Sequence, residues 1–144
     1  MKIAVIGSGG WGTAIAILLS SRGHNVYLWS WIQEETDRLK KDRENKEFLP
    51  GVKFPDTIYC SHDMAECTDG AELIITAAPS PATRTTAKQL SPHVKEGQKI
   101  VNIHYVLLKI KVSLWQFPNR LSQLLQFSFY FSFFCSKFVF RTAK

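Results

Sequence analysis

The stretch "KIAVIGSGGWGTAIAILLSSRG", residues 2–23, decides the fold that this sequence predicts. It opens with a short apolar run that favours a strand and passes through a glycine-rich turn. From Thr13 to Arg22 the apolar residues favour a helix, which Gly23 closes. A strand, a glycine turn and a helix in direct succession predict an α/β protein from the first residues onward.

The turn "GSGGWG" places Gly7, Gly9 and Gly12 in the pattern G-x-G-x-x-G. Alone this pattern is weak, because glycine-rich turns are common. Here it follows a strand and opens a helix, which is the context that dinucleotide binding needs. Gly7 allows a tight turn, Gly9 lets the main chain approach a pyrophosphate, and Gly12 lets helix and strand pack closely. The motif therefore predicts a NAD or NADP site with the phosphates at the helix N-terminus.

Apolar, β-rich segments continue to alternate with helix-favouring segments after residue 23. Further strands are predicted at 25–30, 57–60, 71–78 and 98–103, and further helices at 33–43, around 63–67 and from 81 to about 90. Strands that are apolar almost throughout indicate a parallel sheet that is buried on both faces. We therefore expect an α/β dinucleotide-binding domain of the Rossmann type, with helices on both faces of the sheet, over residues 1–103.

The end of the second predicted strand lacks the acid that often holds the adenine ribose hydroxyls of NAD. Trp29, Ser30 and Trp31 stand there instead. An acid at this place would repel the extra phosphate of NADP, so its absence leaves both cofactors open. Trp31 has two interpretations: it covers the adenine, or it packs at the end of the strand.

The stretch "RENKEFLPG", residues 43–51, is the most distinctive of the chain. By itself it is compatible with a surface loop that Phe48 and Pro50 pin to the protein. Together with the glycine turn, "PDTI" (55–58) and "AAPS" (77–80), however, it resembles the bacterial NAD(P)-dependent glycerol-3-phosphate dehydrogenases. The similarity covers residues 1–103 almost without gaps, and the pairing of G-x-G-x-W-G with N-x-x-F-L-P is specific to that family.

The resemblance implies reversible hydride transfer between NAD(P)H and dihydroxyacetone phosphate, which gives sn-glycerol 3-phosphate for phospholipid synthesis. It also implies a set of cofactor-binding residues: Gly7, Ser8, Gly9, Gly10, Trp11 and Gly12 in the turn, Trp31 at the adenosine end, and Pro79 and Ser80 on the nicotinamide side. Ile32 stands where the family often has a basic residue. Ser80 is equally compatible with a helix N-cap, with Pro81 at the first helical position.

After residue 103 the sequence leaves the family pattern. His104 and Tyr105 stand where the family has a Lys-Gly turn, and the helical domain with the catalytic lysine does not follow. We therefore expect this chain to carry the cofactor-binding part only, with no catalytic residue, no metal ligand and no turnover.

The composition changes at the same point. Residues 104–144 contain no acid and no glycine, eight of the ten phenylalanines and all of the +6 net charge. One interpretation is a segment, 124–140, that binds a membrane interface through its aromatic residues. The other, which we favour, is a shift of reading frame, because the codons permit a family-like "AISEQIE" string around 115–122. Residues 104–144 would then form no domain, and their basic charge is no signal for nucleic acid.

The three cysteines, Cys60, Cys67 and Cys135, are too few and too irregularly spaced for a disulfide framework. We expect a reduced, cytoplasmic protein that binds a dinucleotide, without nucleic-acid or membrane partners. By resemblance, the full-length parent is a homo-oligomer that also binds glycerol 3-phosphate and dihydroxyacetone phosphate. Two alternatives remain: another dehydrogenase with the same domain, such as a hydroxyacid dehydrogenase, and a nucleotide-sensing module with a membrane-seeking tail.

Overall fold

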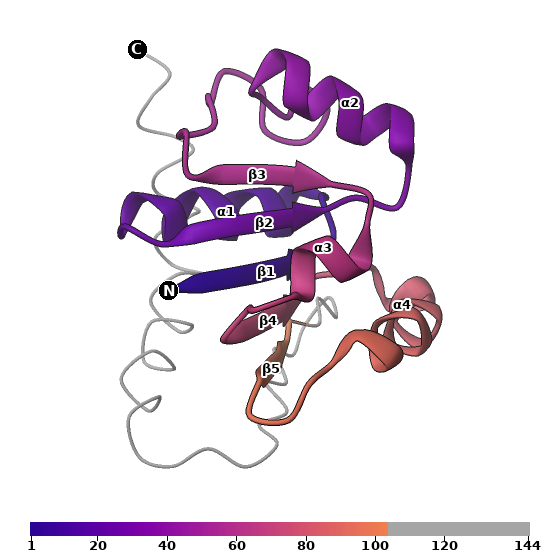
Figure 1. Ribbon diagram of the computed structural model, residues 1–144. Coiled ribbons are helices and arrows are strands. Elements are labelled where there is room, and N and C mark those ends of the chain that lie inside the picture. The colour runs from indigo at the N-terminus through magenta and orange to yellow at the C-terminus, as the bar shows by residue number, and fades with distance from the viewer. Residues whose placement is uncertain (104–144) are drawn as a thin grey trace. The chain divides into compact units, whose positions relative to one another are not determined.

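A computed structural model describes residues 1–103, and the predictions for 104–144 lie outside the described residues. Strands and helices alternate along this part of the chain (Figure 1). The strands are β1 (Lys2–Ile6), β2 (Asn25–Trp29), β3 (Ile58–Ser61), β4 (Leu73–Thr76) and β5 (Lys99–Asn102). The helices are α1 (Gly10–Ser21), α2 (Gln33–Asp42), α3 (Met64–Thr68) and α4 (Thr83–Leu90), with 3-10 turns η1 (Ser80–Ala82) and η2 (Ser91–His93).

Every segment predicted between residues 2 and 103 is present, with ends that differ by a few residues. α1 begins at Gly10 rather than at Thr13, so the last three residues of the glycine motif, 10–12, already belong to the first helical turn. The N-cap alternative for Ser80 is wrong, because Ser80 lies inside η1, whose N-cap is Pro79. No helix within residues 1–103 is long and apolar enough to cross a membrane.

All strand pairs in the sheet are parallel, and the strand order is β3-β2-β1-β4-β5. The chain builds one half of the sheet, then crosses over and places β4 on the other side of β1. Ile6 is in register with Trp29 on one side and with Thr76 on the other. The carboxyl ends of β1, β2 and β4 therefore meet at one edge, where open α/β sheets bind their ligands.

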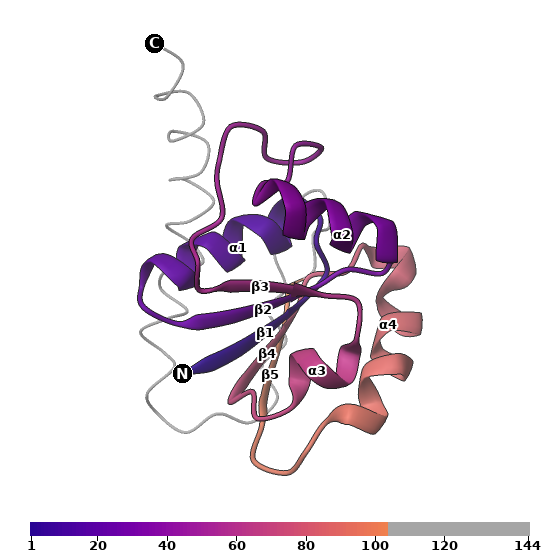
Figure 2. The same ribbon diagram turned by 45° about the horizontal axis from the view of Figure 1, so that its top comes forward.

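Helices cover both faces of the sheet: α1 and α2 lie on one face, and α3 and α4 lie on the other (Figure 2). Alternate residues of β1 supply the two cores, with Ile3 and Val5 in the core of the first face and Ala4 and Ile6 in the core of the second. All four residues are almost completely buried. Because β1 is buried on both faces, its sequence is apolar throughout its buried part. The parallel sheet with helices on both faces confirms the predicted α/β fold.

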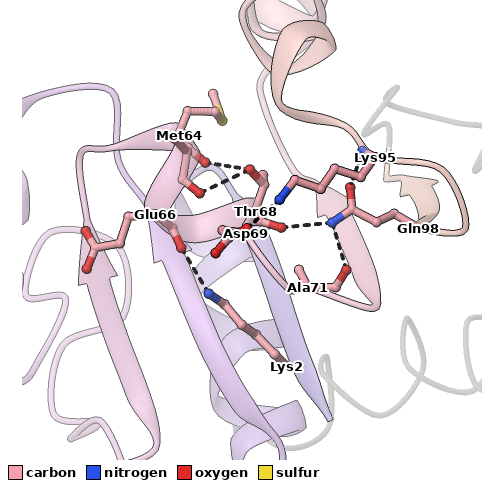
Figure 3. A network of polar contacts seen from close by, with 9 residues as sticks. Lys2, Met64, Glu66, Thr68, Asp69, Ala71, Lys95 and Gln98 are labelled. Atoms are coloured by element: carbon pink, nitrogen blue, oxygen red, sulfur yellow. Dashed lines mark hydrogen bonds and ion pairs between the residues drawn. The ribbon is translucent and has the colours of Figure 1, made fainter.

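At the amino end of the sheet, Gln98 fixes the start of β5 (Figure 3). Its side-chain nitrogen donates to the carbonyl oxygens of Thr68 and Ala71, both at 2.8 Å. Its side-chain oxygen accepts a hydrogen bond of 2.7 Å from the main-chain N–H of Lys95. The Lys95 ammonium lies 2.6 Å from the exposed carboxylate of Asp69 and, through that hydrogen bond, lowers the pKa of Asp69. This network ties the last described strand to α3.

Two cysteines belong to the cores. Cys60 on β3 and Cys67 on α3 are buried, free thiols. Burial raises the pKa of Cys60 to about 11 and the pKa of Cys67 to about 12. Both side chains are therefore protonated at neutral pH and act as small apolar core residues.

Candidate functional site

The turn between β1 and α1 requires glycine at two positions. Gly7 has a φ of +124°, and a Cβ on it would lie 2.9 Å from the carbonyl oxygen of Ala77. A Cβ on Gly12 would lie 1.8 Å from the carbonyl oxygen of Gly7. The chain thus turns tightly at Gly7, and α1 approaches β1 more closely than any side chain would allow. This is the geometry that the sequence predicted for Gly7 and Gly12.

Gly9 faces open space at the start of α1. It is the N-cap of α1, with an ordinary φ of −64°, and a Cβ on it would meet no atom within 4 Å. No side chain within residues 1–103 caps this helix end, and the first turn of a helix presents main-chain N–H groups that have no partner inside the helix. A helix N-terminus carries partial positive charge and binds anions. The turn therefore fits the pyrophosphate of a dinucleotide, which needs room against the main chain and N–H donors.

The side chain of Asn45 holds the glycine turn from outside. Asn45 is buried, and its amide nitrogen donates to the carbonyl oxygen of Ser8 at 2.7 Å and to the hydroxyl of Thr13 at 2.8 Å. The Thr13 hydroxyl itself donates to the same Ser8 carbonyl at 3.0 Å. These three bonds fix both the turn and the first half of α1.

The loop 43–51 is consequently pinned by its asparagine. Phe48 and Pro50 are both exposed, so the interpretation that they pin the loop is wrong. The main-chain N–H of Phe48 donates to the side-chain oxygen of Asn45 at 3.3 Å, which uses both ends of the amide. Phe48 also lies beside the glycine turn, since a Cβ on Gly10 would be 3.8 Å from the Phe48 Cβ.

Arg43 directs the chain from α2 into this loop. It is the C-cap of α2, with a left-handed φ of 50°, and it turns the chain there. Its guanidinium donates to the carbonyl oxygens of Pro55 at 2.6 Å and Ile58 at 2.8 Å. Arg43 thereby joins the end of α2 to the start of β3, which are the two ends of the segment that carries Asn45.

A carboxylate that sequence reasoning did not select lies beside the turn. The Ser8 hydroxyl donates to Oε1 of Glu35 at 2.7 Å, and the Ser30 hydroxyl donates to Oε2 at 2.6 Å. Ser8 and Ser30 are buried, and Glu35 is half-buried in the first turn of α2. Glu35 therefore joins the turn after β1 to the residue that directly follows β2.

Trp31 lies at the carboxyl end of β2 with about half of its surface exposed, 51%. Its ring meets the ring of Trp29 edge-on at 6.0 Å. The Trp29 indole N–H donates to the main-chain oxygen of His62 at 2.8 Å, which fixes that supporting ring. Trp31 thus packs against Trp29 at a right angle, and about half of its surface stays open to a ligand.

The loop after β4 runs against the glycine turn. The N–H of Ala77 donates to the carbonyl oxygen of Ile6 at 2.8 Å, and Pro79 and Ser80 follow as exposed residues. A pocket of about 500 Å³ lies next to them, between α4 and strands β4 and β5, with Thr76 among its lining residues. The structure thus brings the glycine turn, Trp31 and the loop of Pro79 and Ser80 to one edge of the sheet.

Comparison with known sequences agrees with this site. The family described as the N-terminus of NAD-dependent glycerol-3-phosphate dehydrogenase matches residues 2–109. A glycerol-3-phosphate dehydrogenase [NAD(P)+] from Fusobacterium nucleatum is 43% identical over 103 residues, which are 72% of this chain and 31% of that protein. Its namesake from Thermus thermophilus is 46% identical over 92 residues, 64% of this chain and 29% of that protein. The chain spans about a third of the length of these curated relatives.

Solved structures show the same relationship. Glycerol-3-phosphate dehydrogenase from Coxiella burnetii has a TM-score of 0.69 at 29% identity, over 71% of this chain and 31% of that chain. The enzyme from Saccharomyces cerevisiae has a TM-score of 0.65 at 25% identity, over 72% of this chain and 33% of that chain. The sequence match and the shared fold lead to one conclusion: this chain belongs to the NAD-dependent glycerol-3-phosphate dehydrogenase family, through the N-terminal domain of those enzymes.

Proposed function

We propose that residues 1–103 bind NAD(H) or NADP(H) at the carboxyl edge of the sheet. The observation that carries the proposal is the open space at Gly9, beside the N-terminus of α1, which no side chain of the described residues caps. Such an end offers N–H donors and positive potential to a pyrophosphate. Gly7 and Gly12 support the proposal in another way. Their close main-chain contacts leave no room for any larger residue, as the tight turn and close helix packing of a dinucleotide site require.

The other predicted contacts are assigned by their places along this edge. Ser8, Gly10 and Trp11 lie in the turn or in the first turn of α1, next to the proposed pyrophosphate position. The half-exposed ring of Trp31 is proposed to cover the adenine. Pro79 and Ser80 are proposed to contact the nicotinamide side, because they follow β4, on the other side of β1 from β2.

In a full-length protein this domain is proposed to serve reversible hydride transfer between NAD(P)H and dihydroxyacetone phosphate, which gives sn-glycerol 3-phosphate. The bound dinucleotide supplies or accepts the hydride. The names of the relatives support this reaction. We expect no turnover from the 144-residue chain, because hydride transfer also requires groups that hold the second substrate, and His104 and Tyr105 replace the expected Lys-Gly turn.

Titration with NADH tests the binding proposal directly. Trp11, Trp29 and Trp31 lie in or near the site, so binding should transfer excitation energy from tryptophan to the nicotinamide and give a saturable signal. ADP-ribose should compete, because it carries the adenosine and pyrophosphate halves. A chain that is folded by circular dichroism and gives no saturable signal would contradict the proposal. Oxidation of NADH by dihydroxyacetone phosphate in the same sample would contradict only the expected lack of turnover.

For residues 104–144 we propose an origin in another reading frame. The support is compositional, since this segment has no acid and no glycine. Reading the coding DNA from codon 95 in all frames tests it, and a continuation with a Lys-Gly pair is expected. Sedimentation with anionic liposomes that is lost on deleting 104–144 would instead favour the membrane-seeking tail.

A cytoplasmic location and a homo-oligomeric full-length protein complete the proposal. The free, buried thiols of Cys60 and Cys67 support a reducing compartment. Cell fractionation tests the location, and sedimentation velocity of a full-length relative tests the assembly.

A further inference from the structure

We propose that Glu35 makes this site selective for NAD(H) over NADP(H). Its carboxylate is placed to accept the adenine ribose hydroxyls of a bound dinucleotide. The inference rests on the proposed dinucleotide function and goes beyond it, because the curated relatives are named for NAD(P)+ and no residue of the sequence pattern assigns a preference between the two cofactors.

The place of the carboxylate is the first step. Domains of this kind usually carry an acid for the ribose at the carboxyl end of the second strand. Here Ser30 directly follows β2, and its hydroxyl donates to Glu35 at 2.6 Å. The other carboxylate oxygen of Glu35 accepts from Ser8 in the glycine turn at 2.7 Å. The Glu35 carboxylate, which comes from α2, thus lies where the sequence pattern lacks an acid. It stands between the glycine turn and the end of β2, the two segments proposed to flank the adenosine.

The remaining hydrogen-bonding capacity of the carboxylate is the second step. An ionised carboxylate accepts about four hydrogen bonds, two at each oxygen. Ser8 and Ser30 each use one position on a different oxygen. Each oxygen of the half-buried Glu35 can therefore accept a further hydrogen bond. The neighbouring 2′- and 3′-hydroxyls of a ribose are two donors at the spacing of two carboxylate oxygens.

The charge near this position is the third step. NADP replaces the 2′-hydroxyl donor by a phosphate, which only accepts hydrogen bonds and carries nearly two negative charges at neutral pH. Between Ser30 and Glu35 the chain has no basic residue, and the exposed Trp31 and Ile32 are uncharged. The 2′-phosphate would therefore meet a fixed carboxylate, and residues 30–35 supply no cation to offset that charge, which disfavours NADP.

Glu35 could also act only as a brace between α2 and the glycine turn. A brace would affect both cofactors equally, because they share the pyrophosphate that the turn binds. A ribose ligand would change the ratio of the two dissociation constants. This ratio, rather than either constant alone, separates the two roles.

The experiment measures the dissociation constants of NAD⁺ and NADP⁺ by calorimetry for the 144-residue chain, for Glu35→Gln and for Glu34→Gln. Glu34 is the matched control, because it is the neighbouring acid in the first turn of α2 and its side chain is exposed. We expect the unaltered chain to bind NAD⁺ at least about tenfold more tightly, which is about 1.4 kcal/mol. Glu35→Gln should reduce this ratio at least about fivefold, and Glu34→Gln should change it less than about twofold.

Three results would overturn the inference or separate it from the proposed function. Equal binding of both cofactors by the unaltered chain overturns the selectivity and leaves the dinucleotide function standing. If Glu35→Gln loses affinity for both cofactors by the same factor, Glu35 only braces the glycine turn, and the selectivity is overturned. Absence of binding of either cofactor by the folded chain refutes the proposed function itself.

If Glu35→Gln does not fold, the salt dependence of cofactor binding by the unaltered chain tests whether the selectivity comes from a charge. Repulsion between the carboxylate and the 2′-phosphate is screened by ions. The preference for NAD⁺ should therefore decrease between about 0.05 M and about 0.5 M salt. A preference that stays constant over this range would overturn the assignment to a charge.

Discussion

Asn45 and Ser8 lie 37 residues apart in sequence and are joined by a hydrogen bond of 2.7 Å between the Asn45 amide nitrogen and the Ser8 carbonyl oxygen. The same amide nitrogen reaches Thr13 in α1. The shape of the glycine turn is therefore set by a residue outside the glycine motif.

Replacement of Asn45 by alanine should weaken both the fold and the cofactor site. It removes the bonds to Ser8 and Thr13 and leaves buried polar groups without this partner, which costs about 1–3 kcal/mol. Urea unfolding measures this loss, and NADH titration should show weaker binding. Glu47→Ala, two residues away and exposed, is the control and should change stability by less than about 0.5 kcal/mol. Equal stability of Asn45→Ala and Glu47→Ala would contradict the stabilising role of the Asn45 hydrogen bonds.

Alanine at Gly9 should separate binding from stability. Its Cβ would enter open space, and the lower preference for alanine at an N-cap is offset in part by the stiffer unfolded chain, so we expect the free energy of unfolding to fall by no more than about 1 kcal/mol. The same Cβ would occupy room proposed for the pyrophosphate, so the affinity for NADH should fall at least about tenfold. Unchanged NADH affinity in a folded Gly9→Ala protein would place the phosphates elsewhere.

Alanine at Gly12 should instead damage the fold. Its Cβ would lie 1.8 Å from the carbonyl oxygen of Gly7, a main-chain atom that cannot rotate away. We expect a loss of at least about 3 kcal/mol, because α1 must move off β1. Thermal unfolding followed by circular dichroism measures it, with Gly9→Ala as the matched glycine control. A Gly12→Ala protein as stable as Gly9→Ala would contradict the close packing.

Gln98 should matter more for stability than the ion pair beside it (Figure 3). Gln98→Ala removes three hydrogen bonds that tie β5 to its neighbours, with an expected loss of about 1–3 kcal/mol. Lys95→Ala breaks only the exposed pair with Asp69, which solvent screens, so its effect should be smaller. Urea unfolding of both variants gives the order, and the reverse order would contradict this account.

The two buried thiols should make the protein less stable in alkali. The pKa of Cys60 is raised to about 11 and that of Cys67 to about 12 by burial, so an unfolded chain releases these protons first. The contribution of the protonated thiols to the free energy of unfolding is complete below the pKa of an unfolded cysteine, near 9. It is lost as the pH rises from there towards the folded values of about 11 and about 12. Urea unfolding at several pH values should show the decline, and a Cys60→Ala, Cys67→Ala double variant should decline less steeply. An identical decline in both proteins would contradict the assignment.

The sheet and its helices could be predicted because their signals are local and periodic. Residues 3–6 are buried on alternating faces and therefore form an unbroken apolar run. Gly23 ends the first helix as expected, with a φ of +82° that favours glycine. The ends of elements were less certain, since Ser80 joined a 3-10 turn instead of capping it.

The site could be predicted only where the motif itself contains it. The roles of Gly7 and Gly12 follow from main-chain geometry, which the spacing of glycines reveals. Asn45 and Glu35 reach the turn from other segments, and a single polar residue has no periodicity that marks its partners. The sequence of loop 43–51 is distinctive, but the interpretation that Phe48 and Pro50 pin it is wrong, because both are exposed and the buried Asn45 holds the loop.

The strand order β3-β2-β1-β4-β5 has a consequence for synthesis on the ribosome. β1 emerges first and becomes the central strand, and β2 and then β3 extend the sheet on one side. β4 and β5 later extend it on the other side. At no stage must a new strand insert between two strands that are already paired, so the domain can assemble outward from its N-terminus in the order in which the chain is made.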